Sequence, residues 1–213
     1  MTRYLADTAA LARKDLLLEL RGRETLPAMV LFVVSMLVAF RFALTDDGSD
    51  AARGLLWVAI VFTALLGLGR AFVAEREQGL LDGLVLAPCD RSAIWLAKLL
   101  ATLAFLVLVE LIALPAFALF FSGGVDVGTV LAVGLADVGI CAVGTLLAAM
   151  AVAGRARELL LPLLFLPLAL PIVVGGVGAT VAEDAGRYLG FLGLYDLIFA
   201  ILAWATFEYV VTE

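Results

Sequence analysis

The 213-residue chain is 64% hydrophobic, has a formal net charge of −6 and contains no histidine. Soluble domains are close to half apolar, so this composition indicates an integral membrane protein rather than a soluble domain. The lack of histidine excludes imidazole ligation of a metal or haem by this chain, and also histidine acid–base catalysis.

The first 24 residues have the pattern of an amphipathic helix. On a helical wheel Leu5, Ala9, Ala12, Leu16 and Leu20 share one face, and the opposite face carries charges. We therefore predict an N-terminal cytoplasmic helix, residues 1–24, that lies in the membrane interface in contact with lipid. A solvated helix or a loose tail is the alternative, because one acidic residue falls on the apolar side.

Six stretches are long and apolar enough to cross a bilayer, which requires about 20 residues. They form a predicted transmembrane permease domain, residues 25–213, with spans near 25–44, 53–74, 93–121, 126–153, 158–180 and 190–211. The predicted fold class is an all-α membrane protein.

The basic residues are biased to one side of this predicted topology. Of the 14 lysines and arginines, only Arg41, Arg53 and Arg187 fall on the side opposite the termini and loop 75–91. Cytoplasmic loops are enriched in lysine and arginine. Both termini and loop 75–91 are therefore predicted to be cytoplasmic.

Prolines interrupt two of the predicted spans: Pro115 in the third, and Pro162, Pro167 and Pro171 in the fifth. Each proline removes a backbone donor, so the fifth span should be kinked or broken, with freed carbonyls that need partners from neighbouring helices or water. Either a deformable helix at a gate or subunit seam, or plain kinking, fits this pattern.

Ionisable residues also lie within or at the edge of spans: Arg70, Glu110, Asp137 and Asp196. Such groups are costly there and suggest function by default. Glu110 and Asp137 are each 11 residues from the outer end of their span, near mid-membrane. They either line a polar pathway or hydrogen-bond neighbouring helices as neutral acids, which is the simpler interpretation. Lys98 is expected to extend toward the interface.

The cytoplasmic loop 75–91 is the most unusual polar segment. Its candidate partner-binding residues are Glu75, Arg76, Glu77, Asp82, Gly83, Pro88, Asp90 and Arg91. Glycine permits turns and proline prevents a continuous helix, so a short apolar element flanked by charges is expected. Such an element can dock into a groove of an ATPase and transmit its closure, although an ordinary turn between spans is the alternative.

Neither a nucleotide-binding loop nor a zinc motif occurs in the sequence. We therefore predict no catalytic residue, no metal site and no enzymatic activity. If the protein does work, the energy must come from an ion gradient or from a partner subunit.

Several segments carry a family resemblance: residues 14–24, 54–59, 66–72, 75–77, 79–84, 86–88, 90–94, 97–98, the proline-rich 161–171, and 195–199. The chain resembles the CcmB family, the permease subunits of the haem exporter system for cytochrome c maturation. The block from Arg70 to Lys98 is the most specific part of this resemblance.

The resemblance implies an architecture similar to that of ABC-2-type permeases, with ATP hydrolysed on a separate, CcmA-like ATPase subunit that contacts loop 75–91. It also implies two permeases with two ATPases, a CcmC-like haem-handling subunit, a small tail-anchored CcmD-like subunit and a haem chaperone. Haem would be handled by these partners, and this chain would bind no cofactor and no nucleic acid.

The implied function is haem export, or ATP-driven release of a haem-loaded chaperone on the outer face. The alternatives are a permease of another ABC-2-like exporter, which moves a lipid, glycan or drug, and a scaffold that transports nothing.

Overall fold

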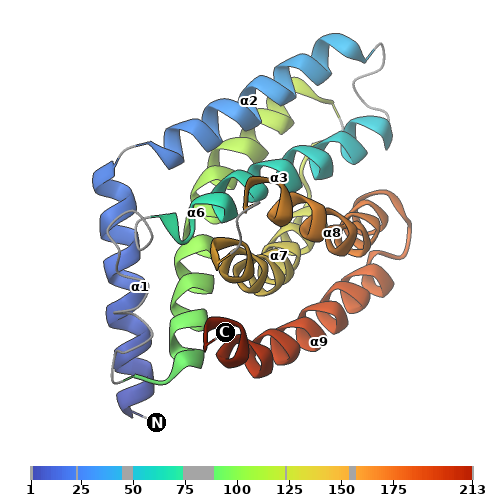
Figure 1. The fold of residues 1–213 in the computed structure, drawn as a ribbon. Helices are drawn as coiled ribbons and strands as arrows, with labels where there is room; N and C mark the ends of the chain where they lie inside the picture. Colours follow the sequence, from blue (N-terminus) through green and yellow to red (C-terminus); the bar gives the residue numbers. More distant parts are fainter. Residues whose placement is uncertain are drawn as a thin grey trace.

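The computed structural model describes residues 2–22, 24–44, 50–73, 89–122, 124–153 and 157–212. Within these ranges it contains seven helices: α1 (Thr2–Gly22), α2 (Thr25–Ala43), α3 (Asp50–Arg70), α6 (Arg91–Phe120), α7 (Val127–Ala153), α8 (Arg157–Val181) and α9 (Ala185–Thr212) (Figure 1). All of them except α1 are long and apolar enough to cross a membrane. The predicted all-α, six-span fold is confirmed.

The helix boundaries agree with the predicted spans to within five residues. The largest shifts are at α3, which occupies 50–70 instead of 53–74, and at the start of α9, which begins at Ala185 instead of 190. Asp50 favours an early start of α3 because a carboxylate in the first turn interacts well with the helix dipole. In the early part of α9, Tyr188 packs against Gly178 of α8.

α7 lies at the centre of the bundle, with α3, α6, α8 and α9 packed around it (Figure 1). Small residues on α7 allow this close approach. A β-carbon at Gly144 would lie 2.2 Å from Leu68 of α3, and one at Gly139 would lie 3.2 Å from the Tyr195 ring of α9. Membrane helices associate largely through such packing, because lipid supplies no hydrophobic driving force between them.

α8 runs as one continuous helix through Pro162, Pro167 and Pro171, and α6 continues through Pro115. Of the two expected outcomes for the fifth span, a break does not occur. The Tyr195 hydroxyl of α9 donates to the Leu168 carbonyl at 2.8 Å, although this is not one of the carbonyls that the prolines leave without a helical donor.

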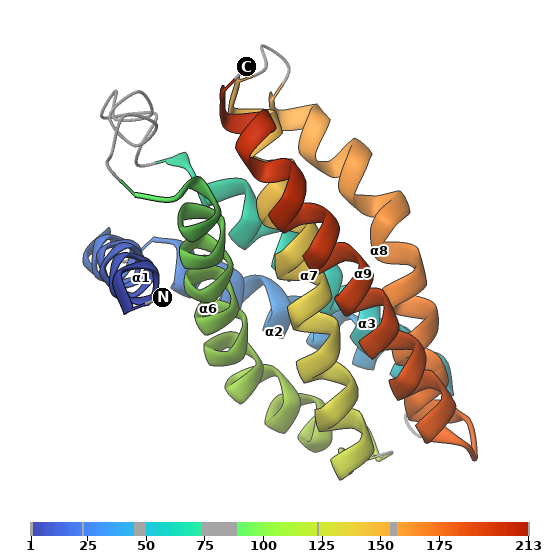
Figure 2. The same cartoon turned by 90° about the horizontal axis from the view of Figure 1, so that it is seen from below.

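α1 lies beside the bundle, with its axis at a steep angle to the axes of the spans. Figure 2 shows α1 nearly end-on, whereas α6, α7, α8 and α9 run lengthwise. Thr8 and Ala12 are its buried residues, and it packs mainly on α6. On the predicted apolar face, Leu5 is 59% exposed and Leu20 is 50% exposed. These leucines therefore point away from the protein, in positions that suit contact with lipid.

Candidate functional site at the charged end of the bundle

Ion pairs between different helices gather at one end of the bundle, here called the inner end. They join Arg70 of α3 to Glu24, Arg91 of α6 to Glu208 of α9, and Lys98 of α6 to Asp15 of α1, each at 3.1 Å. The opposite end, which carries Asp50, Arg53 and Asp126, is called the outer end. Thus α3, α6 and α9, together with α1, are linked where the chain leaves and re-enters loop 75–91.

Lys98 makes the most buried of these contacts. Its side chain is 6% exposed, its Nζ donates to the Ala71 carbonyl at 2.7 Å, and the same nitrogen lies 4.9 Å from the centre of the Phe72 ring. The position of Lys98 relative to the membrane interface stays a prediction, but its ammonium group is enclosed by protein and does not reach solvent. An acidic partner on α1 and a carbonyl just beyond α3 hold the ammonium group inside the protein, which compensates for its desolvation.

Asp90 and Arg91 are the predicted loop residues that the structure describes. The Asp90 side chain caps α6: it accepts a hydrogen bond from the Ser92 backbone N–H at 3.0 Å and from the Ser92 hydroxyl at 2.7 Å. The Ser92 oxygen also lies 3.3 Å from the Tyr4 hydroxyl of α1. Asp90 therefore fixes the start of α6, and Arg91 ties that start to α9.

Cys89 lies directly before this cap. Burial raises the pKa of its thiol, and the nearby carboxylates of Asp7 and Asp90 raise it further. Because the thiolate is the reactive form of cysteine, this thiol is a poor nucleophile. The remaining predicted loop residues, Glu75, Arg76, Glu77, Asp82, Gly83 and Pro88, lie outside the described residues.

The predicted mid-membrane acids occupy the core. Glu110 is 7% exposed and Asp137 is fully buried, and their carboxyl groups lie close enough to interact electrostatically across α6 and α7. Both Asp137 oxygens and one Glu110 oxygen have no hydrogen-bond partner among the described residues. Asp196 reaches α7 at a different position, beside Gly139. Arg70 differs from these three, because it is half-exposed and ion-paired at the inner end.

A small cavity of about 40 Å³ lies between α1, α2, α3 and α6 at the inner end. Its polar lining is Asp15, Glu19, Thr25, Arg70, Lys98 and Thr102. The buried Thr25 hydroxyl has no hydrogen-bond partner within the described ranges. Most of the lining is apolar, and the small enclosed volume suits a few water molecules beside these polar side chains.

The acidic partners at the inner end were missed by sequence reasoning. Asp15 and Glu24 both lie in the family-like segment 14–24, Glu208 lies in none of these segments, and no pairing role is predicted for any of the three. Arg70 is 46 residues from Glu24, and Arg91 is 117 residues from Glu208. No local pattern marks such pairs, because the helix packing alone brings the two side chains together.

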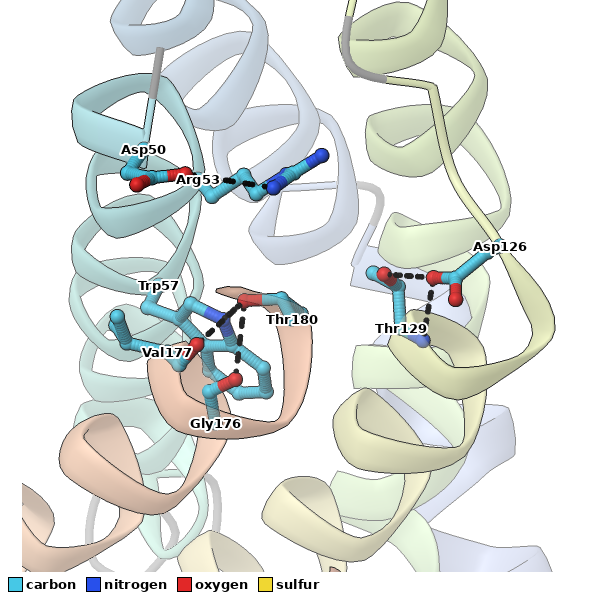
Figure 3. Close-up of polar contacts among 8 residues, drawn as sticks. All are labelled: Asp50, Arg53, Trp57, Asp126, Thr129, Gly176, Val177 and Thr180. Carbon is cyan, nitrogen blue, oxygen red and sulfur yellow. Dashed lines mark hydrogen bonds and ion pairs between the residues drawn. The ribbon is translucent and has the colours of Figure 1, made fainter. Parts of the chain in front are cut away.

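A different kind of contact at the outer end was also missed. Trp57 of α3 is fully buried, and its ring occupies the space left by Gly176 of α8. Its indole N–H donates to the Thr180 hydroxyl at 3.3 Å, and that hydroxyl contacts the carbonyls of Gly176 and Val177 (Figure 3). The sequence does contain a signal for such a contact, because Gly176 is followed one turn later by Thr180. This pattern does not specify which helix supplies the packed side chain.

Comparison with known proteins places the chain in a family. The family model described as CcmB protein matches residues 7–208. The chain is 31% identical over 183 residues to "Heme exporter protein B" of Bradyrhizobium diazoefficiens, which covers 84% of this chain and 82% of that protein. It is 32% identical over 181 residues to the protein of the same name from Pseudomonas aeruginosa, covering 83% and 81%. The relative from Paracoccus denitrificans is 29% identical over 205 residues, covering 93% and 94%. The chain therefore belongs to the CcmB family.

Proposed function

We propose that this protein is the membrane permease subunit of a haem exporter that serves cytochrome c maturation. The observation that carries the proposal is the family match over residues 7–208, on a chain with six apolar helices of membrane-spanning length. Relatives from three organisms bear the name haem exporter protein B and align over most of both chains. The six described spans supply the membrane part of such a complex.

The energy for this work comes from ATP hydrolysed by a separate ABC-type subunit, which docks against loop 75–91. α3 leads into this loop and α6 leaves it, and both helices are tied at the inner end to α1, α2 and α9. Because these contacts join several spans, a force applied at the loop would reach the whole bundle. This geometry supports a coupling role for Glu75, Arg76, Glu77, Asp82, Asp90 and Arg91.

Haem is bound by partner subunits and not through imidazole groups of this chain, because the sequence has no histidine. The proposed partners are a CcmC-like haem-handling subunit, a CcmD-like tail-anchored subunit, a haem chaperone and a second copy of this chain. The proposed location is the inner membrane of a prokaryote, with both termini in the cytoplasm. Contacts of Tyr4 and Glu208 with the start of α6 support this topology, because they bring both terminal helices to the inner end.

Gene disruption tests the assignment to cytochrome c maturation. Membrane proteins of the disrupted strain would be stained for covalently bound haem, with the re-expressed gene as the control. We expect all c-type signals to disappear and to return on re-expression. Retained signals in a strain with no second maturation system would contradict the proposal and favour another ABC-2-like exporter.

Charge reversal in the loop tests the coupling to an ATPase. Glu75→Lys combined with Glu77→Lys should abolish haem delivery, while the spans stay folded and the partner continues to hydrolyse ATP. The matched variant Glu75→Gln with Glu77→Gln removes the charges without reversing them, so its defect should be milder. Normal c-type cytochrome levels in a well-expressed charge-reversal strain would overturn the coupling role.

A further inference from the structure

Lys98 of α6 contacts two other parts of the inner end at once. It belongs to α6, it forms an ion pair with Asp15 of α1, and it donates to the carbonyl of Ala71, one residue after α3 ends. The Phe72 ring lies against the same ammonium group, at 4.9 Å. The cation therefore sits at the point where α1, α6 and the end of α3 meet.

This ion pair differs from a surface ion pair because both of its side chains are largely buried, which suits a contact that holds helices in fixed positions. The Lys98 side chain is 6% exposed and the Asp15 side chain is 10% exposed, so solvent screens their attraction little. Both must find partners inside the protein, because an unpaired buried charge is strongly unfavourable. Asp15 also contacts Lys14 at 3.0 Å, which leaves its carboxylate shared between two cations.

We propose that Lys98 is a positioning residue that fastens α1 and the end of α3 to α6, so that the three move as one unit. This unit holds the stretch of chain that enters loop 75–91, and it keeps α1 in a fixed place relative to that entry. Its role in transport rests on the proposed coupling function of the loop. The fastening of α1 and the end of α3 to α6 by Lys98 does not depend on that function.

Fastening by Lys98 can be tested by measuring the distance between α1 and α3. Spin labels are placed on exposed positions of α1 and α3, by Arg13→Cys and Leu66→Cys, in a Cys89→Ser background; the native Cys141 is fully buried. With Lys98 present we expect one narrow distance distribution in lipid nanodiscs. Lys98→Met should broaden it measurably, because both links that Lys98 makes, to Asp15 and to Ala71, are lost. Asp15→Asn should broaden it less, because the Ala71 link remains.

Two further variants keep the test interpretable. The double variant Asp15→Asn with Lys98→Met leaves no unpaired buried charge from this pair. Its distance distribution therefore tests whether Lys98 fastens α1 and α3 to α6, even if Lys98→Met alone does not fold. The control Arg53→Met removes an ion pair at the outer end of α3, 3.4 Å from Asp50, and should leave the distribution unchanged. An unchanged distribution in both Lys98→Met and the double variant would overturn the proposal. Equal broadening in Arg53→Met would overturn it too.

The contribution to transport is read from the complex with its ATPase. In Lys98→Met the amount of c-type cytochrome matured per ATP hydrolysed should fall roughly tenfold, within the usual range of coupling free energies. Lys98→Arg should restore part of it, because arginine keeps the charge and the donors. A merely structural role would lower the amount of folded complex without changing this ratio, and an unchanged ratio would overturn the role in transport. If cytochrome maturation is normal in Glu75→Lys with Glu77→Lys but the distance distribution still broadens in Lys98→Met, the proposed coupling by the loop is wrong and the proposed fastening by Lys98 is supported.

Discussion

The two ends of the helix bundle are held together by different physical means. At the inner end, ion pairs connect α1, α2, α3, α6 and α9 across long sequence separations. At the outer end the ion pair and the helix cap in Figure 3 are local: Arg53 contacts Asp50, and Asp126 contacts Thr129. There α3 and α8 are connected by the packing of Trp57 into the space at Gly176 and by one neutral hydrogen bond, from the Trp57 indole to the Thr180 hydroxyl.

This difference has a mechanical consequence. Exposed ion pairs contribute little free energy and exchange partners readily, so two of the inner-end links can rearrange at low cost. A fully buried indole packed on glycine has no alternative arrangement of similar energy, because protein interiors are close-packed. Under the proposed coupling to an ATPase, the outer end would act as a fixed point and the inner end would transmit movement, with Lys98 as its most buried link.

The largest expected effect comes from breaking that most buried link. Lys98→Met should lower the free energy of unfolding by up to about 3 kcal/mol, the lower end of the usual cost of breaking a buried pair, because Asp15 keeps its contact with Lys14. Titration with a denaturing detergent in mixed micelles measures it. The double variant with Asp15→Asn should recover part of the loss. A loss as small as that of an exposed ion pair would show that both ends are held by packing alone.

The next effect concerns the outer end. A β-carbon at Gly176 would lie 2.5 Å from the Trp57 ring, so Gly176→Ala should cost about 1–3 kcal/mol through overpacking. Gly54→Ala is the matched control, since no atom lies within 4 Å of the added carbon. The same detergent titration serves for both. If the two variants are equally stable, the outer end is more adaptable than the packing indicates.

A smaller effect is expected at the start of α7. Asp126→Ala removes the cap formed with Thr129, and helix caps of this kind contribute about 1 kcal/mol. Asp126→Asn should keep the cap, because asparagine also accepts a hydrogen bond there.

The same carboxylate predicts a pH dependence. Hydrogen bonds from the Thr129 side chain and backbone hold the pKa of Asp126 below its ordinary value. The charged form is therefore favoured in the folded protein: its contribution is fully present above the unfolded pKa, about 3.9, and is lost as the pH falls through the lower folded value. The stability difference between the native protein and Asp126→Asn should shrink in that acidic range. A constant difference would contradict the assignment.

The smallest effect sharpens the contrast within the inner end. Arg70→Gln breaks the pair with Glu24, whose side chains are 47% and 75% exposed, so the loss should be at most about 1 kcal/mol. It should shrink further at high salt, because screening weakens exposed pairs most. A loss that is large and independent of salt would show that Arg70 acts through the neighbouring cavity.

The sequence by itself determined the class of the protein and its spans. Long apolar stretches have few stable arrangements other than membrane helices, because every backbone polar group must be satisfied within the segment. The same reasoning placed Glu110 and Asp137 at similar depth, and the structure brings their carboxyl groups together. The family segments from Arg70 to Lys98 led to the CcmB family, which the match over residues 7–208 confirms.

Only the tertiary structure decided how the helices are joined. The enclosure of the Lys98 ammonium group was not predicted, because it depends on the packing of α1 on α6, which brings Asp15 to it. Glu24, Glu208 and Thr180 gained their partners in the same way, since each contact depends on the position of a helix distant in sequence. Helix length and polarity follow from local residue patterns, whereas side-chain pairing between helices depends on packing that no local pattern encodes.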